Sequence, residues 1–331
     1  MAIIFGRPKY PSSPEGGSSY SITLPVERMR LIAYFFFVTL VGFASILFNT
    51  LVLPSIEAGA PDGTPTEEMG CGPFNRDVDH SIMKEFGLHF GDGFNLATSH
   101  LTELFGFTNV CVLWDYTPAR EIVAMYFPLF EYSLAGYVML DLIYVTLSHK
   151  RGEIPDWYYS VVKIVSPFTI LLIAWFRMIF VMIAYTDPEE HSLAFLGMQI
   201  ALFSVVIMNS LFVILSGQSY PSIGLTKGTT TKLAYAYLIC NVVVSSIKMG
   251  ATLYIVQNTY SPDWYKFPFP MFGWCRGEAL DRVWMFFNAV LPIFISYVRM
   301  SNEKPMTITF SVPTPTYEGN QKTSETTGLV N

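Results

Sequence analysis

Six long apolar runs constrain the fold of this chain more than any other feature of its sequence. Each is close to the length of about 18 to 20 apolar residues that crosses the roughly 30 Å hydrocarbon core of a bilayer as a helix. Only 14% of the residues are charged, against roughly 25% in soluble domains. We therefore expect an all-α integral membrane protein with six transmembrane helices. The runs extend over Leu31–Leu53, Ile122–Leu147, Val161–Tyr185, Leu193–Leu215, Leu233–Val256 and Val283–Met300.

The basic residues predict the orientation of these spans, because cytosolic flanks are enriched in Lys and Arg. Placing the N-terminus in the cytosol puts about twice as many basic residues on cytosolic as on outer flanks. Both termini are therefore predicted to be cytosolic, with the first run retained as a signal anchor. The domain limits that we expect are a disordered N-terminus at 1–29, a membrane domain at 30–300 and a disordered tail at 301–331. The long acidic loop at 54–120 would then be lumenal or extracellular.

Charged residues within the spans are functional candidates, because an ionisable group in hydrocarbon is costly unless it is paired or hydrated. Glu131, Arg177 and Lys248 fall at a similar depth on three helices, and Asn288 lies close to that level. One interpretation is a lipid or anion site in which the two cations hold a phosphate. The other is a buried ion pair that fixes helix register. Two cations against one acid favour an anionic ligand or a hydrated cavity.

A second polar layer is predicted nearer the cytosol, formed by Asp141, Asn209 and Asn241. Asp141 and Glu131 lie on the same span, so a polar seam along that helix is conceivable on geometric grounds. Gly197 and Ala201, four residues apart in the fourth run, indicate close helix packing.

Motifs for catalysis, metal binding or cofactor binding are absent from the sequence. It contains no HExxH, GxSxG, P-loop, GxGxxG or histidine box. We accordingly assign no catalytic residues, no metal and no cofactor, and favour a protein that is not an enzyme. The lack of a basic cluster gives no support for nucleic acid as a partner.

Three of the four cysteines fall on the predicted outer side, where oxidation is expected in a lumen. One disulfide with an odd thiol is the expectation. Cys71 with Cys275 would tie the acidic loop to the last hairpin, and Cys71 with Cys111 is the alternative. Cys240 lies within the fifth span.

Several short landmarks resemble a six-span family. It includes the damage-regulated autophagy modulator, the FGF-receptor-activating protein and the GPI-anchor lipid-remodelling factor. The best stretch runs from Phe180 to Leu215, with an acidic turn, His191 and Asn209. The supporting motifs are Cys71-Gly72-Pro73, Pro118-Ala119-Arg120 and Cys275-Arg276-Gly277-Glu278-Ala279. The chain departs from the family at Asn75-Arg76-Asp77, where a Pro-Ser stretch is expected, and in its longer outer loop.

This resemblance implies an accessory factor of secretory or endolysosomal membranes that supports lipid handling. In one branch the process is the lipid remodelling of GPI anchors. Its partners would be membrane lipids, with GPI-anchored or other membrane proteins as further candidates. Golgi or endoplasmic reticulum is the expected location, and the plasma membrane and lysosome are the alternatives. His191 would occupy a lumenal family-like position.

Two functions from other classes remain open. A small-solute or ion transporter would use Glu131, Arg177, Lys248 and Asp141 as its pathway. A membrane scaffold would act through the acidic loop, for example through Gly59–Glu68.

Overall fold

The computed structural model describes residues 18–52, 114, 118–182, 188–258, 274–300 and 306–312. The chain divides into two compact units. One runs from Pro25 to Lys304 and is helical, and the other contains the segments on either side of it.

Six helices among the described residues are long and apolar enough to cross a membrane, which confirms the six spans predicted from the sequence. Most are longer than the apolar runs that revealed them, because polar and charged residues extend the helices at their ends. The helices of this unit are α1 (Val26–Leu47), α5 (Ala119–Lys150), α6 (Asp156–Trp175), α7 (Pro188–Ser216), α8 (Lys227–Asn258), α9 (Trp274–Met285) and α10 (Leu291–Met300).

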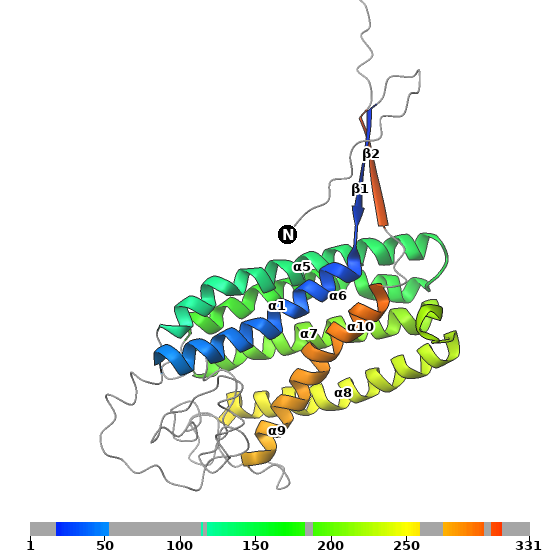
Figure 1. Cartoon of the computed structure of the whole chain (residues 1–331). Coiled ribbons are helices and arrows are strands. Elements are labelled where there is room, and N and C mark those ends of the chain that lie inside the picture. Colours follow the sequence, from blue (N-terminus) through cyan, green and yellow to red (C-terminus); the bar gives the residue numbers. More distant parts are fainter. Residues whose placement is uncertain are drawn as a thin grey trace, which may run out of the picture. The chain divides into compact units, whose positions relative to one another are not determined.

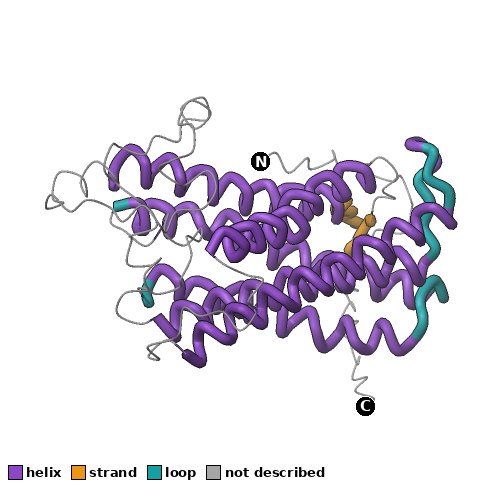
Figure 2. Tube along the Cα trace, turned by 90° about the horizontal axis from the view of Figure 1, so that it is seen from below, coloured by secondary structure: helices purple, strands orange, loops and turns teal. Residues whose placement is uncertain are grey.

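The helices pack side by side in a bundle (Figures 1 and 2), and their contacts close into a ring. Along the chain, α5, α6, α7, α8 and α9 each contact the next, and α1 contacts both α5 and α10. The first and last helices are therefore neighbours, and the end of α10 meets the beginning of α1. In Figure 1, α10 rises away from α8 toward that end of the unit.

Three of the described spans end in or contain a segment of another helical form. The first continues from α1 into a π-helical segment, Phe48–Val52. The third span ends in a 3₁₀ segment, Phe176–Phe180. The sixth contains a π-helical segment, Phe286–Val290, between α9 and α10. Such segments mark local strain and are frequent at functional positions. The second and third of these segments contain Arg177 and Asn288, two of the polar residues predicted to matter.

The side-chain packing has the pattern of a bundle surrounded by lipid. Tyr158, Val162 and Phe212 are buried where α6 meets α7. Large apolar side chains such as Met125, Ile164 and Tyr297 are exposed on the outside. In water these would form an aggregating surface, but they suit a hydrocarbon environment.

Each of the two segments that flank the helical unit contributes one strand, and the domain limits stay a prediction. Strand β1 (Ser18–Leu24) pairs antiparallel with β2 (Met306–Val312). Both alternate apolar residues with Ser or Thr, a period of two that favours a strand. The register places apolar opposite apolar, as in Ile22 with Ile308.

Candidate functional site

The charged layer predicted from the sequence consists of two separate ion pairs. In the first, Nε of Arg177 donates to Oε2 of Glu131 at 2.5 Å, and Nη2 donates to the hydroxyl of Tyr132 at 3.0 Å. The glutamate is buried, whereas the arginine side chain is 48% exposed. This pair joins the end of the third span to α5 at the surface of the bundle.

The second pair joins Lys248 of α8 to Asp281 of α9, and both side chains are buried. The lysine also lies over the ring of Phe195, with Nζ 5.5 Å from the ring centroid. Asp281 was absent from the charged layer that we predicted, because it precedes the apolar run that marked the last span. Including it balances two cations with two acids, so the charge count no longer favours an anionic ligand at this level.

Asn288 and Asn241, which we had assigned to different layers, belong to one buried ring of hydrogen bonds. Asn241 Nδ2 donates to Asn288 Oδ1 at 3.0 Å, and Asn288 Nδ2 donates to Ser245 Oγ at 3.1 Å. Ser245 Oγ completes the ring by donating to Asn241 Oδ1 at 3.3 Å. These side chains bond to one another, which is the arrangement of polar residues that hold membrane helices together.

The π-helical segment next to this ring receives a donor from α8. The hydroxyl of Tyr237 donates to the carbonyl of Phe287 at 2.7 Å. In a π-helix that carbonyl would accept from the residue five positions later, which is Pro292 and has no N–H. Tyr237 therefore supplies the donor that the proline lacks.

Asn209 of the inner layer accepts two hydrogen bonds at Oδ1, from the hydroxyl of Tyr137 at 2.8 Å and from Nη1 of Arg299 at 3.1 Å. Asp141 lies beside it and lines a small cavity of about 20 Å³ together with Asn209. The remaining wall includes three hydroxyl side chains, Ser166, Thr169 and Ser204. A polar cavity of this size can hold one water molecule.

The remaining sequence candidates have separate positions. His191 lies buried in the first turn of α7, where its Nδ1 donates to the carbonyl of Met182 at 2.8 Å. The bond ties α7 to the end of the third span. Cys71 and Cys111 lie outside the described residues, and the side chain of Cys275 is not described, so the disulfide stays a prediction. Cys240 is a free thiol on the outer surface of α8.

Sequence reasoning missed a cluster of charged residues where α1 begins and α10 ends. Arg299 Nη2 contacts Glu27 Oε1 at 2.5 Å, and Arg30 Nη1 lies 3.5 Å from Glu27 Oε2. All three side chains are buried. The count of basic residues on cytosolic flanks included both arginines. Their positive charge therefore entered the topology prediction, but their burial was not foreseen. The sequence signal that could have revealed this cluster is Glu27, which lies one helical turn before Arg30 at the start of the first span.

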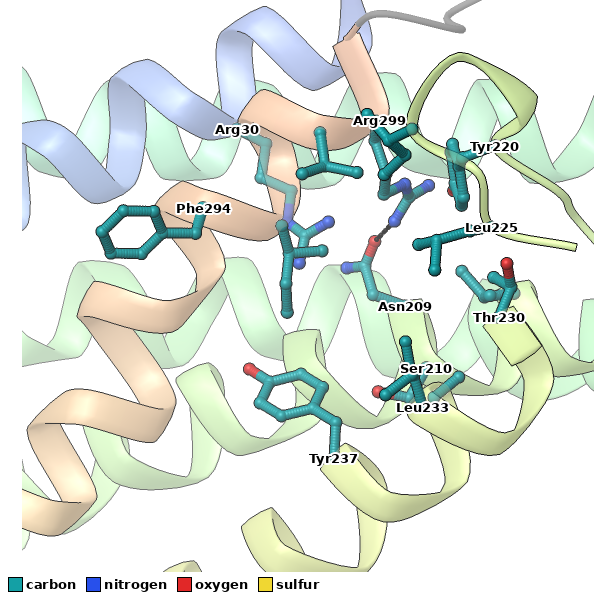
Figure 3. Close-up of a pocket in the computed structure, with 15 residues that line it drawn as sticks. Arg30, Asn209, Ser210, Tyr220, Leu225, Thr230, Leu233, Tyr237, Phe294 and Arg299 are labelled. Atoms are coloured by element: carbon teal, nitrogen blue, oxygen red, sulfur yellow. Dashed lines mark hydrogen bonds between the residues drawn. The ribbon is translucent and has the colours of Figure 1, made fainter.

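A cavity of about 250 Å³ adjoins this cluster, between α7, α8 and α10 (Figure 3). Figure 3 shows Arg30 and Arg299 reaching from α1 and α10 toward Asn209. Two apolar residues of its wall are largely exposed, Leu233 of α8 at 54% and Phe294 of α10 at 60%. The cavity therefore reaches the lipid-facing surface between α8 and α10.

Several polar groups on the cavity wall are buried without a hydrogen-bond partner among the described residues. They are Nε and Nη1 of Arg30, Oγ of Ser210 and Oγ1 of Thr230. The guanidinium of Arg30 does lie about 6 Å from the ring centroids of Tyr34 and Tyr137, a range in which the rings attract a cation. Leaving such groups without hydrogen bonds costs about 1–3 kcal/mol each.

Tyr220, in the α7–α8 connection, closes one side of the same cavity. Burial raises the pKa of its phenol above the ordinary value. The hydroxyl donates to Oε1 of Gln218 at 2.6 Å.

Comparison with known proteins gives no family: no family model, curated protein or solved structure matches the chain. Membership of the six-span family is thus a prediction from short motifs. The helices themselves define the class, a multi-pass membrane protein. Within that class, the candidate site is the cavity with Arg30 and Arg299 at its polar end.

Proposed function

We propose that this protein binds membrane lipid and supports lipid handling as an accessory factor. The observation that carries the proposal is the cavity between α7, α8 and α10. Its wall is largely apolar, as in Val213, Leu233 and Phe294, and it reaches the surface that would face the acyl chains of the bilayer. A concave apolar site with a few polar groups is the usual form of a ligand site.

Filling the cavity tests this proposal. Ala234 of α8 lines the cavity, whereas Ala236 on the same helix is exposed away from the lining residues. We expect A234F to reduce the lipid that remains bound to the purified protein, measured by native mass spectrometry after detergent exchange. A236F adds the same side chain and should leave the bound lipid unchanged. Equal lipid retention by both variants and the unmodified protein would contradict the proposal.

The proposed membership of the six-span family extends this function to GPI anchors. That version would locate the protein in the Golgi or endoplasmic reticulum and place the anchor phosphate near Arg177 and Lys248, on the predicted lumenal side. Each of these cations has an acidic partner, Glu131 and Asp281, so an anchor phosphate would compete with a carboxylate. Mass spectrometry of the anchor lipid on a GPI-linked reporter, from cells with and without the gene, tests it. An unchanged anchor would remove this branch.

Transport is the second candidate, and Asp141 is the residue that favours it. An acid beside a water-sized polar cavity, here in the last third of α5, is a feature of proton and ion pathways. The test is solute or proton flux into liposomes that contain the purified protein. Flux that D141N abolishes would support transport, and no flux above that of empty liposomes would count against it.

A further inference from the structure

The charged residues on the cavity wall are both cations, Arg30 and Arg299, although acids lie nearby. We infer that the cavity accepts the anionic head group of a phosphate-bearing lipid, with Arg30 as the cation that binds it. This inference rests on the proposed lipid-binding function and adds the chemical class of the ligand.

The two arginines differ in how well their donors are used. Arg299 makes a 2.5 Å contact with Glu27 and a 3.1 Å hydrogen bond to Asn209. Arg30 is 1% exposed, and its contact with the same carboxylate is longer, at 3.5 Å. Its Nε and Nη1 have no hydrogen bond to any described residue. Arg299 is thus held by two short contacts, whereas Arg30 contacts Glu27 only at longer range through Nη1 and keeps Nε without a hydrogen bond among the described residues.

Two hydroxyl groups add to this donor set. Ser210 of α7 and Thr230 of α8 are both buried and both line the cavity, and their side-chain oxygens have no hydrogen-bond partner in the described part of the chain. A phosphate offers several acceptor oxygens, and charge-assisted hydrogen bonds to them are stronger than bonds between neutral groups. A guanidinium and a hydroxyl group can each donate to such an oxygen.

The depth of these residues also fits a lipid head group. Arg30 lies four residues after the start of α1, about 6 Å along the helix axis. Arg299 is one residue from the end of α10. The arginines therefore lie near the membrane interface, where lipid phosphates lie, and the apolar part of the cavity extends toward the hydrocarbon. At about 250 Å³ the cavity holds part of a lipid, with the rest in the bilayer.

The acids near the cavity do not replace the ligand. Glu27 contacts Arg299 and is not among the lining residues, and Asp141 lines the smaller cavity on the far side of Asn209. An anion entering from the lipid would therefore meet cations first.

The experiment compares lipids that differ in head group. The full-length protein is reconstituted in nanodiscs of phosphatidylcholine with an equal amount of phosphatidic acid, and the lipid that stays bound after detergent extraction is quantified by native mass spectrometry. We expect about tenfold more bound phosphatidic acid than phosphatidylcholine, the ratio given by one additional charge-assisted contact. R30Q should bring the ratio close to one, and R30K should keep part of the preference.

A matched control is R151Q, which removes an exposed arginine that pairs with Glu153 in the α5–α6 connection, away from the cavity lining. It should keep the preference of the unmodified protein. S210V keeps both cations and should lower the preference for phosphatidic acid without abolishing it. This variant tests the inference even if R30Q fails to fold.

Competition with excess inorganic phosphate distinguishes the two possible bound anions, a lipid head group and free phosphate. Inorganic phosphate should not displace bound phosphatidic acid if the acyl chain contributes, and full displacement would indicate a site for free phosphate.

The outcomes separate this inference from the proposed function. Equal retention of the two lipids by the unmodified protein, with both reduced by A234F, would overturn the anionic preference and leave lipid binding intact. If A234F does not change lipid retention, both the anionic preference and the lipid-binding function are overturned. That result would indicate that the cavity holds water only.

Discussion

Lys248 and Asp281 carry their charges in the interior of the bundle, so each depends on the other for compensation. Removing one partner of a buried pair leaves an uncompensated charge and is much more destabilising than replacing both. An exposed pair has water as a substitute and contributes little.

We predict that K248M lowers the free energy of unfolding by about 3–5 kcal/mol, measured by thermal or denaturant unfolding of the purified protein in detergent. The double variant K248M/D281L should be more stable than K248M, because no buried charge remains. R151Q, which breaks the exposed pair with Glu153, should cost about 0–1 kcal/mol. A cost for K248M as small as that for R151Q would contradict the buried pair.

The hydroxyl of Tyr237 leads to a second prediction for a single residue. Y237F removes the donor to the Phe287 carbonyl and leaves a buried acceptor unsatisfied, which costs about 1–3 kcal/mol. Tyr235, two residues earlier, is exposed, so Y235F should have little effect in the same unfolding assay. If the two variants unfold alike, Pro292 does not require this compensation.

At the level of helices, Gly197 of α7 lies close against the end of α6. A Cβ built on this glycine would lie 3.3 Å from Cδ1 of Trp175 and 3.7 Å from Cδ2 of Leu172. The sequence had indicated close packing here from Gly197 and Ala201. Gly136 of α5 has nothing within 4 Å of the corresponding position.

We therefore expect G197L to destabilise the protein by about 1–3 kcal/mol, the usual cost of overpacking. G136L adds the same side chain where there is space and should be tolerated. The melting temperatures of the two variants in one detergent provide the comparison. A G197L protein as stable as G136L would mean that α6 and α7 can separate at no cost.

The spans could be read from the sequence because the requirement for about 20 apolar residues acts along the chain itself. The partners of the charged residues could not be read in this way. Asp281 precedes the last apolar run, and Arg30 and Arg299 resemble flanking charges, although the helices continue through all three. Their pairing depends on which helices become neighbours in the ring, and that is a property of the packed bundle.

For the whole molecule, the contact between Glu27 and Arg299 requires the start of α1 and the end of α10 to lie on the same face of the membrane. An even number of spans likewise places both ends of the membrane domain on one face of the membrane. From the positive-inside rule we predict that this face is the cytosolic one. On this prediction the acidic loop at 54–120 lies on the other side.

Engineered glycosylation tests this topology. D62N creates an acceptor sequence with Gly63 and Thr64 in the acidic loop, and we predict that the protein made in cells then carries one glycan, seen as a mass shift that a glycosidase removes. K322N creates an equivalent sequence with Thr323 and Ser324 in the tail and should remain unmodified. Glycosylation of K322N without D62N would invert the topology.

The closure of the ring by α1 and α10 also has a consequence for biosynthesis. Glu27 and Arg30 are among the first residues of the bundle to leave the ribosome, and Arg299 is among the last. Until α10 enters the membrane, the nascent chain must carry an acidic and a basic side chain at the start of α1 without their final neighbour. A chain that is truncated before α10 retains that polar surface, which is a mark by which the quality-control machinery of the cell can select it for degradation.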